Sequence, residues 1–367
     1  MNKSKICIIA DQIYKSGGIE RVLSHRINHW INIGHEVSLI THENKDNLAY
    51  FDLNSDVAHF DLEASFNKKK SLFAPSNIKL AASYFFKFKK AFYDINPDVV
   101  IVVNYSYDFY FIPLIKSSSY AIKEYHSSFT KTKGVAGYMR KIASKFYDKH
   151  VFLSKEEQDL SHIYKSVVIP NPIIDKDTLP SRLADREKVI LAAGRIVTIK
   201  GFERLIESWS RIASIYPDWR LEIYGDGEQS YIESLNTLIF QKSISENTKI
   251  FPSTPYITNR MLNSRIYAMT SFTECFPMVL LEAMQSKMAV ISFDCPTGPR
   301  NIIKQQKTGI LVSDNNIDDF TIQLENIINS NCIGQRLADN AYDDVQKYNI
   351  DIIMKKWDRL IQKRLKK

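Results

Sequence analysis

Two glutamates with seven residues between them, Glu274 and Glu282, interrupt a segment that is otherwise largely apolar. Glu274 falls in a loop after a predicted strand, whereas Glu282 falls inside a predicted helix whose first residue is Pro277. A carboxylate buried in an apolar helix is costly unless it is hydrogen-bonded. A ligand hydroxyl would satisfy Glu282, and a backbone N–H or a buried lysine would do so equally well. The pair marks a candidate binding site.

Two cations five residues apart, Arg195 and Lys200, stand between a predicted strand and a predicted helix. Fixed cations at the carboxyl end of a parallel strand suit a diphosphate. The alternative is a pair of solvated surface charges, the usual fate of arginine and lysine. We expect the diphosphate role because both residues directly follow a strand.

Backbone amides at two predicted helix starts offer further groups that bind anions. The pair Gly17-Gly18 separates the first strand from a helix, and another helix N-terminus lies at Phe276, Pro277, Met278 and Val279. The glycine pair is equally compatible with a plain tight turn. A dinucleotide fold with Glu43 on a ribose is a competing interpretation, but its G-x-G-x-x-G spacing is absent.

Short apolar, β-branched runs alternate with segments of helical period along the whole chain. This alternation predicts an α/β fold with parallel, doubly wound sheets covered by helices. In the first half we expect strands at Lys5–Ala10, Glu36–Thr41, Asp98–Val103, Ala121–Tyr125 and His150–Leu153, and helices at Ile19–Gly34 and Ile78–Ile95. In the second half we expect strands at Val189–Ala193, Arg220–Tyr224, Lys249–Phe251, Arg265–Met269, Ala289–Ser292 and Gly309–Val312, and helices at Phe202–Ile215 and Ile350–Leu365.

Two prolines, Pro170 and Pro172, break this pattern and predict a domain boundary. We expect a first domain over residues 1–172, a second over 173–348, and a C-terminal helix over 349–367 that packs back on the first domain. Two α/β halves joined by one hinge leave a cleft between them, which is a preferred place for a ligand.

The composition narrows the class of protein. The chain has 44% hydrophobic residues, a net charge of +8, and four cysteines without C-x-x-C spacing, which suits a reducing cytoplasm. The apolar run Ile6–Ala10 is too short for the core of a signal peptide, and no run reaches the roughly 18 apolar residues of a membrane span. We therefore expect a cytoplasmic protein.

A basic, aromatic segment runs from Ala64 to Tyr93, with seven lysines and no acid. Such a segment suits an anionic membrane surface or a lipid diphosphate. Nucleic acid is disfavoured because no reader motif accompanies the charge. The remaining alternative is a solvated helix whose aromatic residues fill the core. The lysines expected to form the membrane or acceptor surface are Lys68, Lys69, Lys70, Lys87, Lys89 and Lys90.

Taken together, these motifs resemble glycosyltransferase family 4, whose members are retaining transferases of GT-B fold that use nucleotide sugars. The run Glu274–Arg300 is similar to the subgroup that builds capsule, O-antigen and lipid-linked oligosaccharides. The resemblance covers nearly the whole chain and is weakest over Lys45–Lys90. Its motifs are Glu274-x7-Glu282, Gly17-Gly18-Ile19-Glu20-Arg21, Gly34-His35-Glu36-Val37, Pro170-Asn171-Pro172, Gly194-Arg195…Lys200-Gly201 and Tyr224-Gly225-Asp226-Gly227.

The resemblance implies a role for each site residue. Arg195 and Lys200 would neutralise the diphosphate, and the amides of Gly17, Gly18 and Phe276–Val279 would hold phosphate and donor sugar. Glu274 would hold sugar hydroxyls and Glu282 ribose hydroxyls. His126 matches the histidine of the family's first domain that lines the sugar site. Cys275 and Lys287 stand where the family usually has glycine.

The resemblance also implies a mechanism with retention at the anomeric carbon, by front-face attack and without a protein nucleophile. We expect no metal cofactor, because the two cations and a helix N-terminus can stabilise the leaving diphosphate. The only D-x-D, Asp175-Lys176-Asp177, we interpret as surface charge.

The expected donor is a nucleotide diphosphate sugar, with a UDP-sugar favoured, and the expected acceptor is a lipid-linked or growing surface glycan at the cytoplasmic face of the inner membrane. The alternatives are a sugar-nucleotide epimerase of the same fold and a non-catalytic relative that has lost turnover.

Overall fold

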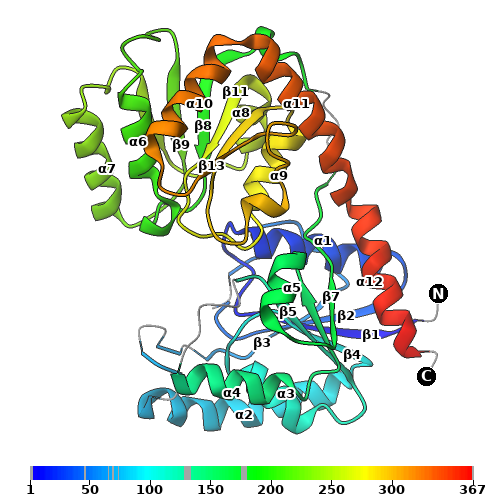
Figure 1. The fold of residues 1–367 in the computed structure, drawn as a ribbon. Coiled ribbons are helices and arrows are strands. Elements are labelled where there is room, and N and C mark those ends of the chain that lie inside the picture. The colour runs from blue at the N-terminus through cyan, green and yellow to red at the C-terminus, as the bar shows by residue number, and fades with distance from the viewer. Residues whose placement is uncertain are drawn as a thin grey trace. The chain divides into compact units, whose positions relative to one another are not determined.

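A computed structural model describes residues 3–44, 47–64, 66–67, 70–72, 74–127, 134–174 and 180–365 of the chain (Figure 1). The chain divides into two compact units. The first unit contains Met1–Asn171 and Ile353–Lys367, and the second contains Pro172–Ile352. Each unit is built on one parallel sheet with helices on its faces, so each can be considered separately.

The sheet of the first unit has seven parallel strands in the order β3-β2-β1-β4-β5-β6-β7. The interior strand β1 pairs with β2 on one side and β4 on the other, and Ile6 lies opposite Val37 and Val99. All four residues of β4 are buried, as expected for a strand covered on both faces. The strands are β1 (Lys5–Ile9), β2 (Glu36–Thr41), β3 (Ala58–Asp61), β4 (Val99–Val102), β5 (Tyr120–Tyr125), β6 (Lys149–Phe152) and β7 (Ser166–Val168).

Helices cover both faces of this sheet. On one face, α2, α3 and α4 lie side by side (Figure 1), and Tyr84, Phe88 and Phe92 of α2 join the hydrophobic core. Elsewhere in the unit, the last helix, α12, packs on α1, where Trp357 meets the ring of Trp30 edge to face at 6.0 Å. The helices are α1 (Gly18–Asn32), α2 (Pro75–Ile95), α3 (Tyr107–Ile115), α4 (Gly134–Ser144), α5 (Lys155–Ser161) and α12 (Ile350–Leu365).

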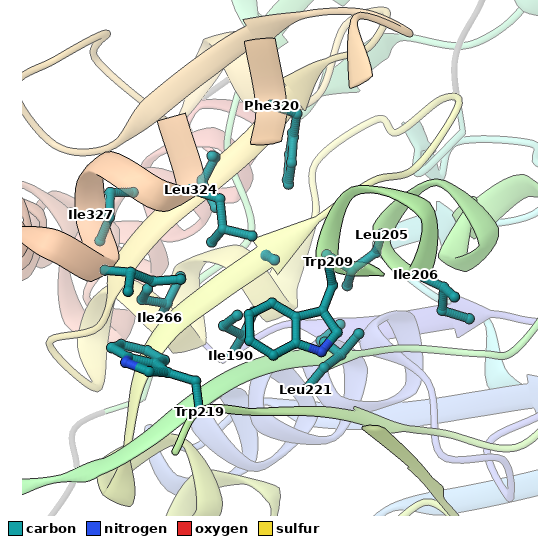
Figure 2. Close-up of a cluster of buried hydrophobic side chains, with 14 of the residues drawn as sticks. Ile190, Leu205, Ile206, Trp209, Trp219, Leu221, Ile266, Phe320, Leu324 and Ile327 are labelled. Carbon is teal, nitrogen blue, oxygen red and sulfur yellow. The ribbon is translucent and has the colours of Figure 1, made fainter. Parts of the chain in front are cut away.

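The sheet of the second unit has six parallel strands in the order β10-β9-β8-β11-β12-β13. Trp209 and Trp219 fill its core beside Leu221 and Ile266 (Figure 2). The strands are β8 (Glu187–Ala193), β9 (Arg220–Tyr224), β10 (Thr248–Phe251), β11 (Ser264–Met269), β12 (Ala289–Asp294) and β13 (Ile310–Ser313). The helices are α6 (Phe202–Ser210), α7 (Gln229–Gln241), α8 (Ile257–Asn263), α9 (Met278–Gln285), α10 (Ile317–Asn329) and α11 (Asn331–Val345).

The predicted parallel α/β architecture is confirmed, and every predicted strand is present within two residues of its expected ends. Three local expectations were wrong. The helix expected over Phe202–Ile215 ends at Ser210, the helix expected from Pro277 begins at Met278, and the helix expected from Ile78 begins at Pro75. The short strand β7 was not predicted. Strand β3 was missed because Ala58–Asp61 is a sheet edge with a weak apolar pattern.

Both sheets reverse their strand order beside the first strand of the unit, between β1 and β4 and between β8 and β11. The connections from two such neighbouring strands leave in opposite directions. A crevice therefore opens at their carboxyl ends, where open α/β sheets bind ligands. This gives each unit one place where a ligand is expected.

Candidate functional site

In the second unit, the residues at the β8/β11 reversal point meet around one ion pair. Nζ of Lys200 lies 2.6 Å from Oε1 of Glu274, and the two side chains are 22% and 12% exposed. Lys200 ends the short 3-10 turn Thr198–Lys200 that follows β8, and Glu274 lies in the loop after β11. Two residues predicted as site residues from separate segments are therefore in direct contact.

Glycines allow the loop after β8 to lie close to its neighbours. Gly201 has φ +59°, and a Cβ there would lie 2.3 Å from the carbonyl oxygen of Thr270. Gly225 and Gly227 follow β9, and their Cβ atoms would lie 1.9 and 2.0 Å from the carbonyl oxygens of Gly194 and Ile196. Only glycine tolerates such approaches. These glycines fix the loop that carries Lys200.

Glu274 is held at both its side chain and its backbone. Ser271 Oγ donates a hydrogen bond to Oε1 of Glu274 at 2.7 Å, and Thr297 Oγ1 donates to the Glu274 carbonyl oxygen at 2.9 Å. A Cβ on Gly298 would lie 2.4 Å from the Glu274 Cβ. The Thr297-Gly298 turn after β12 therefore supports the glutamate from behind.

Glu282 lies one turn inside α9 and is 8% exposed. Tyr267 of β11 lies close enough to Glu274 and Glu282 for their charges to change its pKa. Burial first, then the charges of Glu274 and Glu282, raise the pKa of the Tyr267 hydroxyl, which donates to the Ala193 carbonyl oxygen at 3.2 Å. The two glutamates of the predicted pair thus share one environment.

The start of α9 also lies at this edge of the sheet. Pro277 directly precedes the helix and is buried together with Phe276, whose ring meets Tyr348 edge to face at 5.5 Å. Met278 and Val279 form the first turn and are partly exposed. The first amides of an eight-residue helix have no acceptor within the helix, and its dipole favours an anion there.

Arg195 differs from Lys200 in its surroundings. It is exposed, and no carboxylate among the described residues pairs with it. An exposed arginine beside the Lys200 turn can swing towards an anionic ligand. The structure therefore places it near the site without fixing its side chain.

The two residues that depart from the family pattern occupy different environments. Cys275 is buried next to Glu274. Lys287 follows the end of α9 with φ 57°, a left-handed conformation that favours glycine. Its Nζ also pairs with Asp339 Oδ1 at 2.8 Å. Lys287 is thus a helix-ending residue held by an ion pair.

Gly17, Gly18 and His126 belong to the first unit. Gly17 immediately precedes α1, and a Cβ there would lie 2.0 Å from Oε2 of Glu20. His126 follows β5, and its Nε2 lies 3.1 Å from Oε1 of Glu124. Glu124 in turn accepts two hydrogen bonds from Arg26, both at 2.8 Å. The predicted histidine is therefore anchored by a buried ion pair.

Two lysines of the basic segment, Lys68 and Lys69, lie outside the described residues. Lys70, Lys87 and Lys90 are exposed and Lys89 is half-buried. Some aromatic residues of α2 fill the core, whereas Phe86 on the same helix is 71% exposed. The D-x-D motif at residues 175–177 also lies outside the described residues. Among the helices as described, none is long and apolar enough to cross a membrane.

One cavity in the second unit was missed by the sequence analysis. It has a volume of about 510 Å³ and lies at the carboxyl ends of β9 and β10. The rings of Tyr224 and Phe251 stack at its wall with centroids 4.8 Å apart, and Ser253 and Asn259 add polar groups. In the sequence, only the glycine motif after Tyr224 indicated a site near this cavity, because the loop after Phe251 carries no motif.

Comparisons with known proteins agree with this geometry. Residues 174–344 match the family described as Glycosyl transferases group 1. The amylovoran biosynthesis glycosyltransferase AmsD of Erwinia amylovora is 26% identical over 97% of this chain and 99% of its own length. The lipopolysaccharide 1,6-galactosyltransferase of Salmonella typhimurium is 27% identical over 88% of this chain and 89% of its own. Anabaena HepE, solved with UDP-glucose, has a TM-score of 0.74 at 16% identity and covers 99% of both chains, which shows the shared GT-B fold.

Proposed function

Because the chain belongs to the glycosyl transferases group 1 family and is a glycosyltransferase, we propose that it transfers a hexose or N-acetylhexosamine from a UDP-sugar to a lipid-linked or growing surface glycan. Relatives named for amylovoran and lipopolysaccharide synthesis support this class of acceptor.

The observation that carries the proposal is the contact of Lys200 with Glu274 at the β8/β11 reversal point. A diphosphate needs fixed positive charge, and a sugar ring needs carboxylates that accept hydrogen bonds from its hydroxyls. Here the cation of Lys200 and the carboxylate of Glu274 lie within hydrogen-bond distance of each other, beside the backbone amides at the start of α9. An incoming diphosphate competes with Glu274 for Lys200, so the carboxylate becomes available to the sugar.

The remaining parts of a UDP-sugar also find matching chemistry in the second unit. Glu282 is a buried carboxylate on the helix that follows the Glu274 loop, and it suits ribose hydroxyls. The cavity walled by Tyr224 and Phe251 offers flat aromatic surface and polar groups for a nucleobase. The UDP-glucose bound to the Anabaena relative supports uridine as the base.

The proposed reaction needs no protein nucleophile. The donor's bond from the anomeric carbon to the diphosphate oxygen breaks, and the acceptor hydroxyl attacks on the same face, which retains the anomeric configuration. The leaving diphosphate oxygen takes the proton of that hydroxyl. Lys200, Arg195 and the α9 amides stabilise the charge that develops on the diphosphate, which is the role a metal ion has in other transferases.

A lipid-linked acceptor requires access to a membrane surface, and the first unit offers a suitable face. Helices α2 and α4 expose large apolar side chains, among them Phe86 and Tyr93 of α2 and Tyr138 of α4. Exposed lysines stand beside them, including Lys87, Lys90 and Lys141. Amphipathic, basic surfaces of this kind bind anionic lipid headgroups.

The experiment that tests the proposal incubates the full chain with a panel of UDP- and GDP-sugars. We expect one UDP-sugar to raise the unfolding temperature, since a ligand at 100 times its Kd stabilises a fold by about 2.7 kcal/mol. With acceptor extracts in anionic vesicles, the same donor should give a glycolipid of unchanged anomeric configuration, measured by NMR with a ¹³C-labelled sugar. No thermal response to any of these donors contradicts the proposal. Conversion of the donor without any acceptor favours an epimerase.

A further inference from the structure

Arg204 is a buried cation in the second unit, close to the contact between Lys200 and Glu274. It lies in the first turn of α6, and its side chain is only 4% exposed. Burying a guanidinium costs free energy unless it is hydrogen-bonded and paired, and a cation in the first turn of a helix opposes the helix dipole. Both effects are unfavourable for α6 alone, so the contacts of Arg204 must offset them.

The guanidinium of Arg204 holds the carboxyl end of β11. Its Nε donates a hydrogen bond to the Thr270 carbonyl oxygen at 3.0 Å, and its Nη2 donates to the same oxygen. Thr270 is the first residue after β11, and the next residue, Ser271, donates from its hydroxyl to Oε1 of Glu274 at 2.7 Å. Arg204 therefore fixes the backbone from which Ser271 supports Glu274.

The guanidinium is itself held by a carboxylate and two aromatic rings. Its Nη1 donates to Oδ1 of Asp314, which lies 2.9 Å away and follows β13. The ring centroids of Phe272 and Phe293 lie 3.9 and 4.4 Å from the guanidinium carbon. Arginine suits this place because its planar group donates hydrogen bonds along its edges and stacks on aromatic rings. A lysine could pair with Asp314 but could not reproduce the whole set of contacts.

Gly201 leaves the space in which Arg204 reaches Thr270. A Cβ on Gly201 would lie 2.9 Å from Nε of Arg204 and 2.3 Å from the Thr270 carbonyl oxygen. Gly201 directly follows Lys200, so the turn that carries Lys200 and the loop that leads to Glu274 meet at Arg204. The spacing between Lys200 and Glu274 therefore depends on this buried guanidinium.

We propose that Arg204 is a positioning residue for the transfer reaction, which holds the Thr270–Glu274 loop where the Glu274 carboxylate meets the donor sugar. The inference rests on the proposed function for the identity of the donor as a UDP-sugar. It assigns Arg204 an effect on the sugar rather than on UDP, because its hydrogen bonds to Thr270 hold the loop that carries Glu274.

The test compares the affinities of the full chain for UDP and for UDP-sugars by isothermal titration calorimetry. The sugar-bearing probes are UDP-glucose, UDP-galactose and UDP-N-acetylglucosamine. Arg204→Met keeps a long apolar side chain against the two rings and removes the hydrogen bonds to Thr270 and Asp314. We expect it to weaken the tightest-binding UDP-sugar at least tenfold and to change the affinity for UDP less than twofold. Arg204→Lys, which keeps a charge for Asp314, should lie between Arg204→Met and the parent chain.

A double-mutant cycle tests whether Arg204 acts through Glu274. Glu274→Gln should weaken the same UDP-sugar at least tenfold, and adding Arg204→Met should weaken it less than twofold further, because the two changes remove one interaction. The matched control is Arg211→Met, which removes an exposed arginine that follows the other end of α6 and pairs with Asp318. This control should leave the affinities for UDP and the UDP-sugar unchanged.

The outcomes separate this inference from the proposed function. If the parent chain binds no UDP-sugar, the proposed function is wrong and the role of Arg204 falls with it. If the parent chain binds a UDP-sugar and Arg204→Met binds it equally well, or loses UDP and the UDP-sugar to the same extent, only the positioning role is wrong. Independent, multiplying losses in the cycle overturn the action through Glu274.

Circular dichroism shows whether Arg204→Met folds. Should it fail to fold, Arg204→Lys and Asp314→Asn take its place, since each weakens the hold on Thr270 while leaving a polar group at the buried position. Both should weaken the UDP-sugar at least threefold with the affinity for UDP unchanged. Affinities equal to those of the parent chain would overturn the positioning role.

Discussion

Lys200 and Glu274 are 74 residues apart in the chain, and their side chains meet at 2.6 Å. The contact joins the turn after β8 to the loop after β11, so it couples a cation suited to phosphate with a carboxylate suited to a sugar. Because the pair is mostly buried, neither side chain is free to search widely for a ligand. The site is therefore organised before the donor arrives.

Replacing Lys200 with alanine should remove the main fixed cation from the leaving diphosphate. Loss of one preorganised electrostatic group typically lowers kcat by about 10²–10³. We expect Lys200→Ala to lower kcat/KM for transfer by at least 100-fold, measured as UDP release in the presence of acceptor. The control Lys188→Ala removes an exposed lysine that pairs with Asp218 in the same unit. Equal rates for both variants would contradict the assignment.

Gly298→Ala should disturb Glu274 without removing any charged group, because the new Cβ lies 2.4 Å from the Glu274 Cβ. We expect the KM for the donor to rise at least tenfold while the protein still folds, measured by donor titration and circular dichroism. Gly334→Ala is the matched control, since its Cβ meets neighbours at 3.6 Å in α11. That change should leave KM unchanged and stabilise the helix by about 0.5–1 kcal/mol.

The Arg26–Glu124 pair should give the first unit an acid-sensitive stability. Burial raises the pKa of Glu124, but Arg26 and then His126 lower it well below its usual range. A lowered folded-state pKa means that the stability is present above about pH 4.5, the unfolded value, and is lost as the pH falls towards the folded value.

Glu124→Gln should therefore be less stable at pH 7 by about 3–5 kcal/mol, because Arg26 remains buried without its charge partner. The difference from the parent chain should shrink as the pH falls below 4.5. Urea unfolding at a series of pH values measures both effects. Glu36→Gln, which breaks an exposed pair with Lys3, serves as control and should cost at most about 1 kcal/mol. A constant difference at all pH values argues against the expected titration.

The exposed lysines of α2 should control attachment to anionic membranes. Each such lysine contributes about 1 kcal/mol near the surface, so replacing Lys87 and Lys90 by glutamate should weaken binding by at least about 30-fold at low salt. Cosedimentation of the Lys87→Glu, Lys90→Glu variant with phosphatidylglycerol vesicles measures this. The variant Lys249→Glu, Lys307→Glu has the same net charge but alters the second unit, and it should bind as the parent does. If both variants bind equally, charge alone governs binding and α2 has no special part.

Much of the fold was predictable because parallel strands that are buried on both faces leave continuous β-branched runs, as in β4 and β8. Strand β3 was not predicted because an edge strand needs fewer apolar residues. The site residues Lys200 and Glu274 were predictable from their positions after strands. Their direct contact was not, because it depends on how β8 and β11 pair in space. The contact between His42 and Asp108 was not predictable for the same reason, because neither residue belongs to a recognisable motif and only the folded sheet brings the two together.

The first unit is completed by residues that follow the whole second unit in the chain. Trp357 of α12 covers Trp30 and the guanidinium of Arg26, and Trp30 Nε1 donates to Asp358. During synthesis, the ribosome must therefore release the whole second unit, Pro172–Ile352, before Trp357 can cover Trp30. Until then Trp30 and Arg26 lack their contacts with α12. A premature stop between α11 and Trp357 would leave the second unit whole but the first unit without the cover that α12 provides.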